Sequence, residues 1–177
     1  LLSLLPHTIA LPAWSQPAAD DATTVAARAR FKEGVEAFDK GKYEEARLAF
    51  LQAYTLKKHP SVLLNLAQST AKANRPLEAA GYFKQYLKEA TTATPQQRKD
   101  AEKGLEEVRA KLATISIVAS PGTEVTIDDN KVGAAPIDIQ EVEPGQHTVK
   151  GAGQSVTVTA VIGQRAEARL LKDDKPA

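Results

Sequence analysis

The stretch that decides the fold is GVEAFDKGKYEEARLAFLQA, residues 34–53, together with AQSTAKANRPLEAAGYFKQY, residues 67–86. Small, turn-forming and aromatic residues recur between the two segments at a constant offset of 33 positions. The matching positions pair Gly34 with Ala67, Gly41 with Asn74, Tyr43 with Pro76, Ala46 with Ala79, Phe50 with Phe83, and Ala53 with Tyr86. A period of about 34 residues indicates stacked helical hairpins, in which small residues allow close contact and aromatics fill the gaps. Such stacks form curved surfaces that hold another molecule.

Helical periodicity and turn residues divide the first half of the chain into two hairpins of two helices each. The first helix is expected over residues 24–40, the second begins at Tyr43, and the third begins at Pro60. Asn74 is expected to be the N-cap of the fourth helix. Pro76 follows in its first turn, where the missing N–H of proline costs little.

A fifth helix has a clear start signal. Thr94 supplies a capping hydroxyl, Pro95 occupies the first helical position, and Gln97 occupies the third. Its apolar residues follow at helical spacing and are Ala101, Leu105, Val108 and Leu112. Because stacked repeats need about three units, or caps, to bury their faces, we expect this helix to seal the open end of the stack.

From Thr114 onward the apolar pattern changes from a helical period to a period of two. The turn-forming groups between the alternating runs are Ser120-Pro121-Gly122, Asp129-Asn130, Glu143-Pro144-Gly145 and Gly151-Ala152-Gly153. Short strands separated by such turns predict a small antiparallel β-sandwich over residues 114–171. The expected fold class is therefore α+β, as two segregated domains, with the helical array at residues 24–112.

The two ends of the chain are expected to lie outside these domains. Residues 1–15 are rich in leucine and close with a small-x-small triplet, so we predict an export signal cleaved before Gln16. A short buried helix is the alternative interpretation. Residues 16–23 are expected to form a polar linker, and residues 172–177 a polar tail that frays.

Composition excludes several classes of function. The chain of 177 residues has no cysteine, which excludes disulfides, thiolate catalysis and cysteine-ligated metals. Its formal net charge is +1, without the basic stripe that usually accompanies nucleic-acid binding. The group Lys57-Lys58-His59 is interpreted as an exposed turn rather than a polyanion site. No nucleophile elbow, phosphate loop or zinc spacing occurs, and His147 is interpreted as structural. We therefore expect no enzyme, no cofactor and no metal site, and the apolar runs are too short for a transmembrane helix.

The helical half resembles the tetratricopeptide repeat family over about residues 27–90, at the twelve positions paired above. In that family the first helix of each hairpin lines a concave groove that holds a partner. The resemblance implies groove residues Arg28, Phe31, Val35, Phe38 and Asp39 from the first unit and Ser61, Leu64, Asn65, Gln68 and Lys72 from the second. For Phe31, Val35, Phe38 and Leu64, the alternative is a place in the hydrophobic core.

The expected ligand of this groove is apolar. Some family members bind two carboxylates with a Lys and an Asn at positions where this chain has Phe31 and Val35. Asn65 is the only polar residue that matches this arrangement. An apolar partner segment, such as an amphipathic helix laid in the groove, therefore fits better.

The second half resembles the PEGA domain, a small β-sandwich module common in bacterial envelope and surface proteins, over residues 114–171. The resembling motifs are Ser120-Pro121-Gly122, Val125-Thr126-Ile127-Asp128, Val132-Gly133-Ala134-Ala135-Pro136 and Glu143-Pro144-Gly145-Gln146-His147-Thr148-Val149. The resemblance implies a binding or spacer module. This half contains no aromatic residue, so it offers no stacking platform for sugars or bases.

These features predict an exported, non-enzymatic adaptor or scaffold, periplasmic or otherwise associated with the bacterial cell envelope. Its expected partner is a protein or peptide in the helical groove. The alternative is a cell-wall or polysaccharide-binding module whose β-domain acts through polar edge residues such as Asp128, Lys131 and Gln146. If the export signal is absent, a cytoplasmic assembly factor becomes the leading interpretation. A sandwich this small is marginal alone, and no linker separates Lys111 from Ile115, so we expect the fifth helix to pack partly against it.

Overall fold

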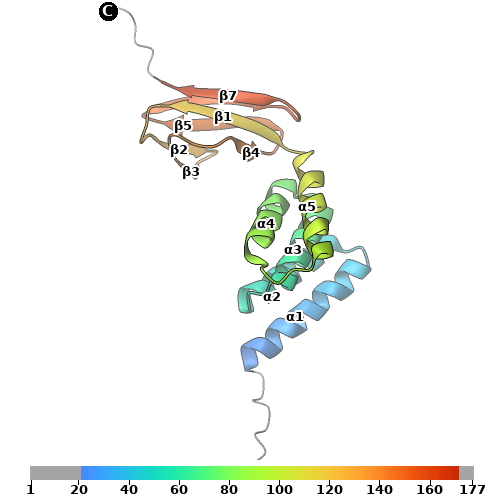
Figure 1. Cartoon of the computed structure of the whole chain (residues 1–177). Helices are drawn as coiled ribbons and strands as arrows, with labels where there is room; N and C mark the ends of the chain where they lie inside the picture. The colour runs from blue at the N-terminus through green and yellow to red at the C-terminus, as the bar shows by residue number, and fades with distance from the viewer. Residues whose placement is uncertain (1–20, 172–177) are drawn as a thin grey trace, which may run out of the picture.

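The computed structural model describes residues 21–171 and places a helical domain and a β-domain end to end (Figure 1). The predicted signal peptide, most of the predicted linker and the predicted tail lie outside the described residues. The helices are α1 (Ala22–Asp39), α2 (Tyr43–Leu56), α3 (Pro60–Lys72), α4 (Pro76–Glu89) and α5 (Pro95–Arg109). The strands are β1 (Ala113–Ala119), β2 (Glu124–Ile127), β3 (Asn130–Ala134), β4 (Gln140–Val142), β5 (Gly145–Gly151), β6 (Gln154–Ala160) and β7 (Arg165–Leu170). The predicted fold class, two segregated α and β domains, is confirmed.

The 33-residue repeat is present in the backbone as well as in the sequence. The turns before α2 and α4 each place a left-handed residue at the same repeat position, with φ +72° at Gly41 and +59° at Asn74. The Gly41 N–H donates to the Phe38 carbonyl at 2.9 Å, and the Asn74 N–H donates to the Ala71 carbonyl at 3.2 Å. Because these donors and acceptors are themselves 33 residues apart, the two hairpins are copies of one local structure.

Two helix starts differ from the prediction. The N-cap position of α4 is Arg75, whose side chain makes no capping hydrogen bond, so the prediction that Asn74 caps this helix is wrong. Asn74 instead takes the left-handed conformation, which asparagine tolerates because its short polar side chain bonds locally. α1 begins at Ala22, two residues before the expected start, since Asp21 accepts a hydrogen bond from the Thr24 N–H at 2.8 Å and caps the helix.

The side chains that repeat in the sequence pack the hairpins together. Phe50 and Phe83 are each 1% exposed, and Ala46 and Ala79 are fully buried between neighbouring helices. α5 packs against α3 and α4. This position is the one expected of a helix that covers the end of the stack.

The β-domain is a sandwich of two sheets, with strand orders β4-β1-β7 and β3-β2-β5-β6. All neighbouring pairs are antiparallel except β1 and β7, which run parallel with Ile115 opposite Ala166. Ile115, Val125 and Val149 are fully buried between the sheets. The parallel pair places the last strand beside the first and so completes the smaller sheet.

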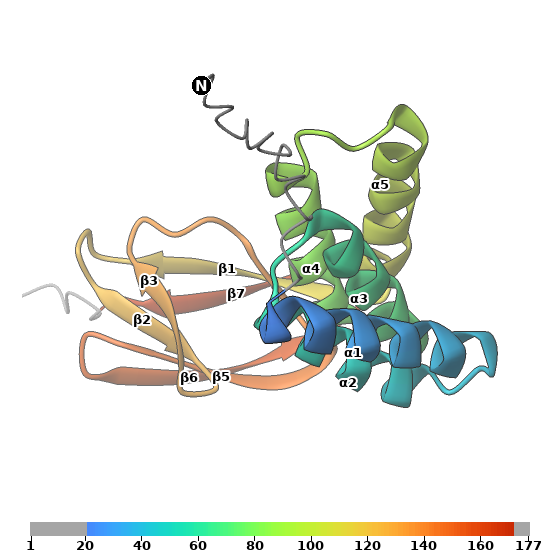
Figure 2. The ribbon, with the colours of Figure 1, turned by 90° about the horizontal axis from the view of Figure 1, so that it is seen from below.

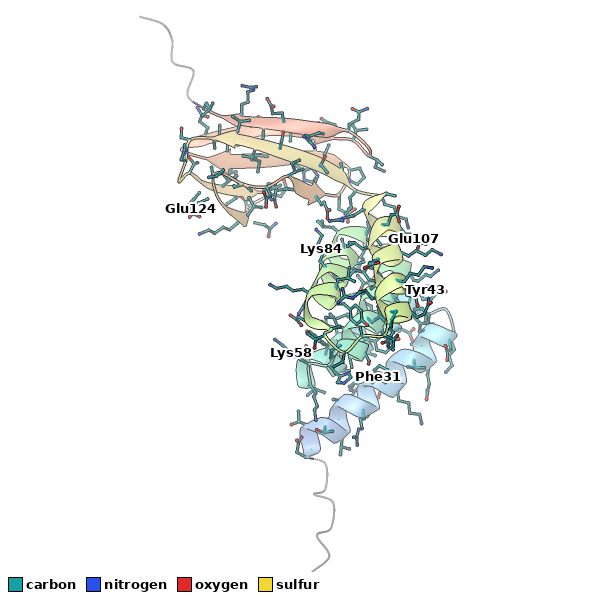
Figure 3. All side chains as sticks on the ribbon, in the orientation of Figure 1. Phe31, Tyr43, Lys58, Lys84, Glu107 and Glu124 are labelled. Carbon is teal, nitrogen blue, oxygen red and sulfur yellow. The ribbon has the colours of Figure 1, made fainter. Side chains whose placement is uncertain are left out.

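The two domains meet without a linker. Leu112 belongs to the helical core, and the next residue, Ala113, belongs to the core of the sandwich. Glu141 on β4 lies between Lys84 on α4 and Arg109 on α5, with 2.7 Å from a carboxylate oxygen to each cation. Lys84 lies where α4 approaches the β-domain (Figure 3). These ion pairs hold α4 and α5 against β4.

Candidate binding groove

Two hollows lie along α1 and α3, two helices that cross in the helical domain (Figures 1 and 2). The N-terminal hollow has a volume of about 400 Å³ and is lined by Thr24, Ala27, Arg28, Phe31, Lys57, His59, Ser61 and Val62. The C-terminal hollow has a volume of about 370 Å³ and is lined by Phe38, Gln68, Ala71, Lys72, Phe83, Asp100, Lys103, Gly104 and Glu107. Since α1 and α3 both contribute to both hollows, we treat them as the two ends of one groove, named here the α1–α3 groove.

Six of the ten predicted groove residues line these hollows. They are Arg28, Phe31 and Ser61 in the N-terminal hollow and Phe38, Gln68 and Lys72 in the C-terminal hollow. Figure 3 shows Phe31 on α1, whose half-buried ring packs against the helical core. The sequence pattern therefore brings residues from two separate helices to the same groove.

The other four predicted residues line neither hollow. Leu64 is buried in the helical core, and Val35 is half-buried against it. The Asn65 side-chain amide donates to a carbonyl one turn earlier in its own helix, at 2.9 Å. Asp39 is exposed at the end of α1.

The N-terminal hollow combines apolar walls with basic side chains. The Lys57 ammonium donates to the Thr24 hydroxyl at 2.8 Å. The His59 Nδ1 accepts a hydrogen bond from the Ser61 N–H at 3.2 Å, so the neutral ring carries its proton on Nε2. The polar lining thus contains several hydrogen-bond donors.

The C-terminal hollow is closed by α5 and has balanced charge. The ring of Phe83 lies against the backbone of α5 at Gly104, where a Cβ atom would stand only 2.5 Å from the ring. On the same helix, Lys103 and Glu107 form an ion pair at 3.8 Å. The hollow's charged lining consists of two lysines and two carboxylates, so it favours neither sign.

Sequence reasoning missed two groups of lining residues. The α5 residues of the C-terminal hollow were assigned only to a capping helix. An isolated glycine inside a helical pattern, Gly104, was the available signal of a close approach. Lys57 and His59 were interpreted as an exposed turn, and both line the N-terminal hollow.

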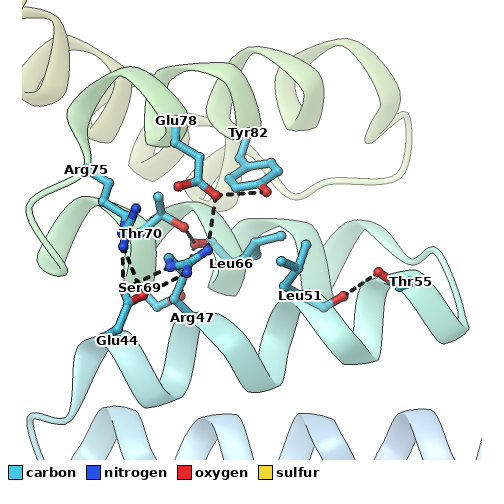
Figure 4. A network of polar contacts seen from close by, with 10 residues as sticks. All are labelled: Glu44, Arg47, Leu51, Thr55, Leu66, Ser69, Thr70, Arg75, Glu78 and Tyr82. Carbon is cyan, nitrogen blue, oxygen red and sulfur yellow. Dashed lines mark hydrogen bonds and ion pairs between the residues drawn. The ribbon is translucent and has the colours of Figure 1, made fainter. Parts of the chain in front are cut away.

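A polar network on the α2–α4 side ties the two hairpins together (Figure 4). The Arg47 guanidinium is 9% exposed and donates to Glu44 at 2.8 Å and to Glu78 at 3.2 Å. Arg75 also donates to Glu44, at 3.1 Å, and the Tyr82 hydroxyl donates to Glu78, at 3.2 Å. The pKa of Glu44 is lowered to about 2, mainly by the hydrogen bond from Arg47 and further by the one from Arg75. Partial burial of the carboxyl group opposes this shift. The hydrogen bonds and ion pairs of these side chains are made to one another, so we interpret the network as a structural contact between the two hairpins.

His147 joins two turns of the β-domain. Its Nδ1 is 2.6 Å from an Asp128 carboxylate oxygen, and its Nε2 is 2.7 Å from the Glu143 carbonyl oxygen. The other Asp128 oxygen accepts the Thr148 N–H at 2.8 Å. Burial tends to lower the pKa of His147, but the two acceptors outweigh it and raise the pKa above its ordinary value of 6.5. The imidazolium is therefore the form that donates to both partners.

Between residues 21 and 171, no group of three or more His, Cys, Asp or Glu side chains is placed to hold a metal ion. None of the helices described is both long enough and apolar enough to cross a membrane.

Comparison with known proteins identifies the β-domain. A family model described as the PEGA domain matches residues 112–150, which run from just before β1 to near the end of β5. The expected PEGA resemblance is confirmed for this segment. No curated protein and no solved structure matches the chain. The chain thus combines a repeated array of helices with a C-terminal PEGA domain.

Proposed function

We propose that the protein is a non-enzymatic adaptor that holds a segment of another protein in the α1–α3 groove. One observation carries the proposal: the two hairpins repeat the same backbone turns, so α1 and α3 present equivalent faces to one groove. Stacked helical hairpins commonly use such faces to bind proteins. We assign the array to the tetratricopeptide repeat family on the same repeat geometry.

The protein acts in the cell envelope in this proposal. The PEGA domain supports this assignment, because the module is common in bacterial envelope and surface proteins. The predicted export signal at residues 1–15 supports it independently. The compartment we assign is the periplasm or another part of the cell envelope.

The groove suits a segment that carries apolar side chains. Phe31 in the N-terminal hollow and Phe38 in the C-terminal hollow form an apolar stripe on α1, seven residues apart, and both are half-buried. Groove-binding segments typically anchor in such a stripe with apolar residues of their own.

The β-domain offers less to a polysaccharide. Of the three polar edge residues that the alternative requires, Asp128 is engaged by His147 and Thr148, and Lys131 pairs with Glu124 at 2.6 Å. Gln146 remains exposed. Two of the three side chains already have partners within the domain, which favours the groove as the working surface.

A pull-down with a matched control tests the proposal. The chain from Gln16 onward is used to capture proteins from a cell-envelope extract of the source organism. The groove variant Gln68→Glu/Lys72→Glu changes the C-terminal hollow. The control variant Gln52→Glu/Lys88→Glu makes the same charge change on exposed positions of α2 and α4 that line neither hollow.

We expect a discrete protein that the parent and the control capture and the groove variant does not. Circular dichroism of the three proteins must first show equal helix content. Equal capture by all three would contradict the groove assignment. Sedimentation of all three with purified cell-wall sacculi, without any captured protein, would instead support the β-domain alternative.

A further inference from the structure

We infer that the N-terminal hollow recognises an acidic side chain that lies beside an apolar one on the partner segment. The inference rests on the proposed function and names the chemistry of the segment that the groove holds. It follows from the charge of the lining residues, the donors they offer and the apolar wall next to them.

Every ionisable side chain that lines this hollow is basic. These residues are Arg28 on α1 and Lys57 and His59 in the connection between α2 and α3, and the lining contains no carboxylate. The Asp21 carboxylate lies close enough to attract Lys57. Asp21 is engaged as the cap of α1, where it accepts from the Thr24 N–H at 2.8 Å and from the Thr24 hydroxyl at 3.3 Å. The hollow therefore complements an acidic group.

Donors remain in the hollow after its internal hydrogen bonds are counted. An ammonium has three donors, and Lys57 directs one of them to the Thr24 hydroxyl. The His59 Nδ1 accepts the hydrogen bond from the Ser61 N–H, which leaves the Nε2–H of the ring as a donor. A carboxylate accepts hydrogen bonds at two oxygens, so it matches donors that come from separate residues.

An apolar wall adjoins these donors. Ala27 and Phe31 on α1 and Val62 on α3 supply it, and Phe31 and Val62 are half-buried. A partner segment gains most if a bulky aliphatic or aromatic side chain lies next to its acidic residue or one helical turn away.

The inferred acidic site also orients the partner. The C-terminal hollow has balanced charge and does not discriminate by sign. Phe31 and Phe38 are seven residues apart on α1, which corresponds to about 10 Å along the helix. The acidic residue of the partner lies over the N-terminal ends of α1 and α3, and the rest of the segment runs toward α5. This arrangement differs from the two-carboxylate clamp, whose Lys and Asn positions hold Phe31 and Val35 here.

Selection from a library of random short peptides displayed on phage tests the inference with the chain from Gln16 onward. We expect the enriched peptides to contain Asp or Glu beside an apolar residue. The dissociation constant of the best peptide is then measured by fluorescence anisotropy. Lys57→Glu, which replaces attraction by repulsion, is expected to weaken binding about tenfold, and neutralising the acidic residue of the peptide is expected to have a smaller effect in the same direction.

Two further variants make the result decisive. Arg28→Glu provides a second charge reversal in the same hollow, should Lys57→Glu lower the helix content. Lys88→Glu on α4 is the matched control and is expected to leave the affinity within about twofold, because exposed charges outside the site are screened.

The two failures are distinguishable. Enriched peptides that show no acidic preference, but are lost with Gln68→Glu/Lys72→Glu, would overturn the inference and leave the proposed groove function standing. Peptides that bind all groove variants as tightly as the parent would overturn the proposed function itself.

Discussion

Gly104 on α5 and the ring of Phe83 on α4 approach so closely that no Cβ atom fits between them. A methyl group on Gly104 would stand 2.5 Å from the Phe83 Cζ atom, and one on Gly34 of α1 would stand 2.7 Å from the ring of Phe50. A glycine inside a helix costs about 0.5–1 kcal/mol relative to alanine. The close packing of ring on backbone explains why this cost is accepted at both positions.

Gly104→Ala is therefore expected to destabilise the helical domain, although alanine is the better helix former. Overpacking costs about 1–3 kcal/mol, which exceeds the helix-propensity gain of about 1 kcal/mol. Gly81→Ala on α4 is the matched control, since nothing beyond its chain neighbours and the backbone of its own helix lies within 4 Å of its Cβ position. This control is expected to stabilise the protein by about 0.5–1 kcal/mol. Urea unfolding measures both, and changes of the same sign would contradict the packing argument.

Glu141→Gln is expected to loosen the contact between the domains. The carboxylate is 18% exposed and pairs with both Lys84 and Arg109. Its loss is therefore expected to lower the free energy that stabilises the contact between the domains by about 1–2 kcal/mol. Nuclear magnetic resonance relaxation is expected to show more independent tumbling of the two domains. Glu167→Gln, which removes an exposed ion pair with Arg169 within β7, is the control.

The same contact is expected to weaken in acid. Burial tends to raise the pKa of Glu141, and Lys84 and Arg109 outweigh it, so the pKa lies below its ordinary value of 4.5. A carboxyl group with a lowered pKa contributes its stability above the unfolded value and loses it as the pH falls through the folded value. The tumbling of the parent is therefore expected to approach that of Glu141→Gln below pH 4.5, and identical tumbling of the two at neutral pH would refute the contact's role.

His147 is expected to stabilise the β-domain more in mild acid than in mild base. Its pKa is raised above 6.5, so its contribution is complete below 6.5 and is lost as the pH rises through the folded value. His147→Gln is expected to cost about 1–2 kcal/mol near pH 5.5 and less near pH 8.5. Urea unfolding at the two pH values measures the difference. In an Asp128→Asn background the difference should shrink, and an unchanged difference would assign the effect to another group.

Arg47→Met is expected to raise the pKa of Glu44 from its present value of about 2 toward 4.5. Arg47 provides the leading hydrogen bond, and Arg75 would remain to hold part of the shift. Carbon-detected titration of the side-chain carboxyl group measures the value. Lys42→Met removes a cation that pairs with Glu45 instead, so Glu44 should titrate as in the parent. A Glu44 pKa that stays at about 2 in Arg47→Met would contradict the geometry.

The helical repeat could be predicted because its determinants are local. Gly41 and Asn74 each encode a turn within one hairpin, Phe50 and Phe83 recur at the same offset, and the fixed offset makes the pattern visible. The role of Asn74 was misjudged because asparagine suits both an N-cap and a left-handed turn. The offset from Gly41 would have favoured the left-handed turn, because glycine takes that conformation more readily than any other residue.

The groove could be predicted only in part, for a physical reason. The stripes on α1 and α3 follow from helical periodicity, but a stripe does not encode which neighbour approaches it. The lining contributed by α5 at Gly104 and by the turn at Lys57 depends on long-range packing. Likewise, a period of two shows which face of β7 is buried but not that its neighbour is the parallel strand β1.

The junction between Leu112 and Ala113 has a mechanical consequence. α1 begins at one end of the molecule and β7 finishes near the other (Figure 1). Because adjacent residues belong to the two cores, a pull between these ends meets no extensible linker at the junction between the domains. Tension applied to the sandwich is therefore transmitted directly to α5, which forms one wall of the C-terminal hollow.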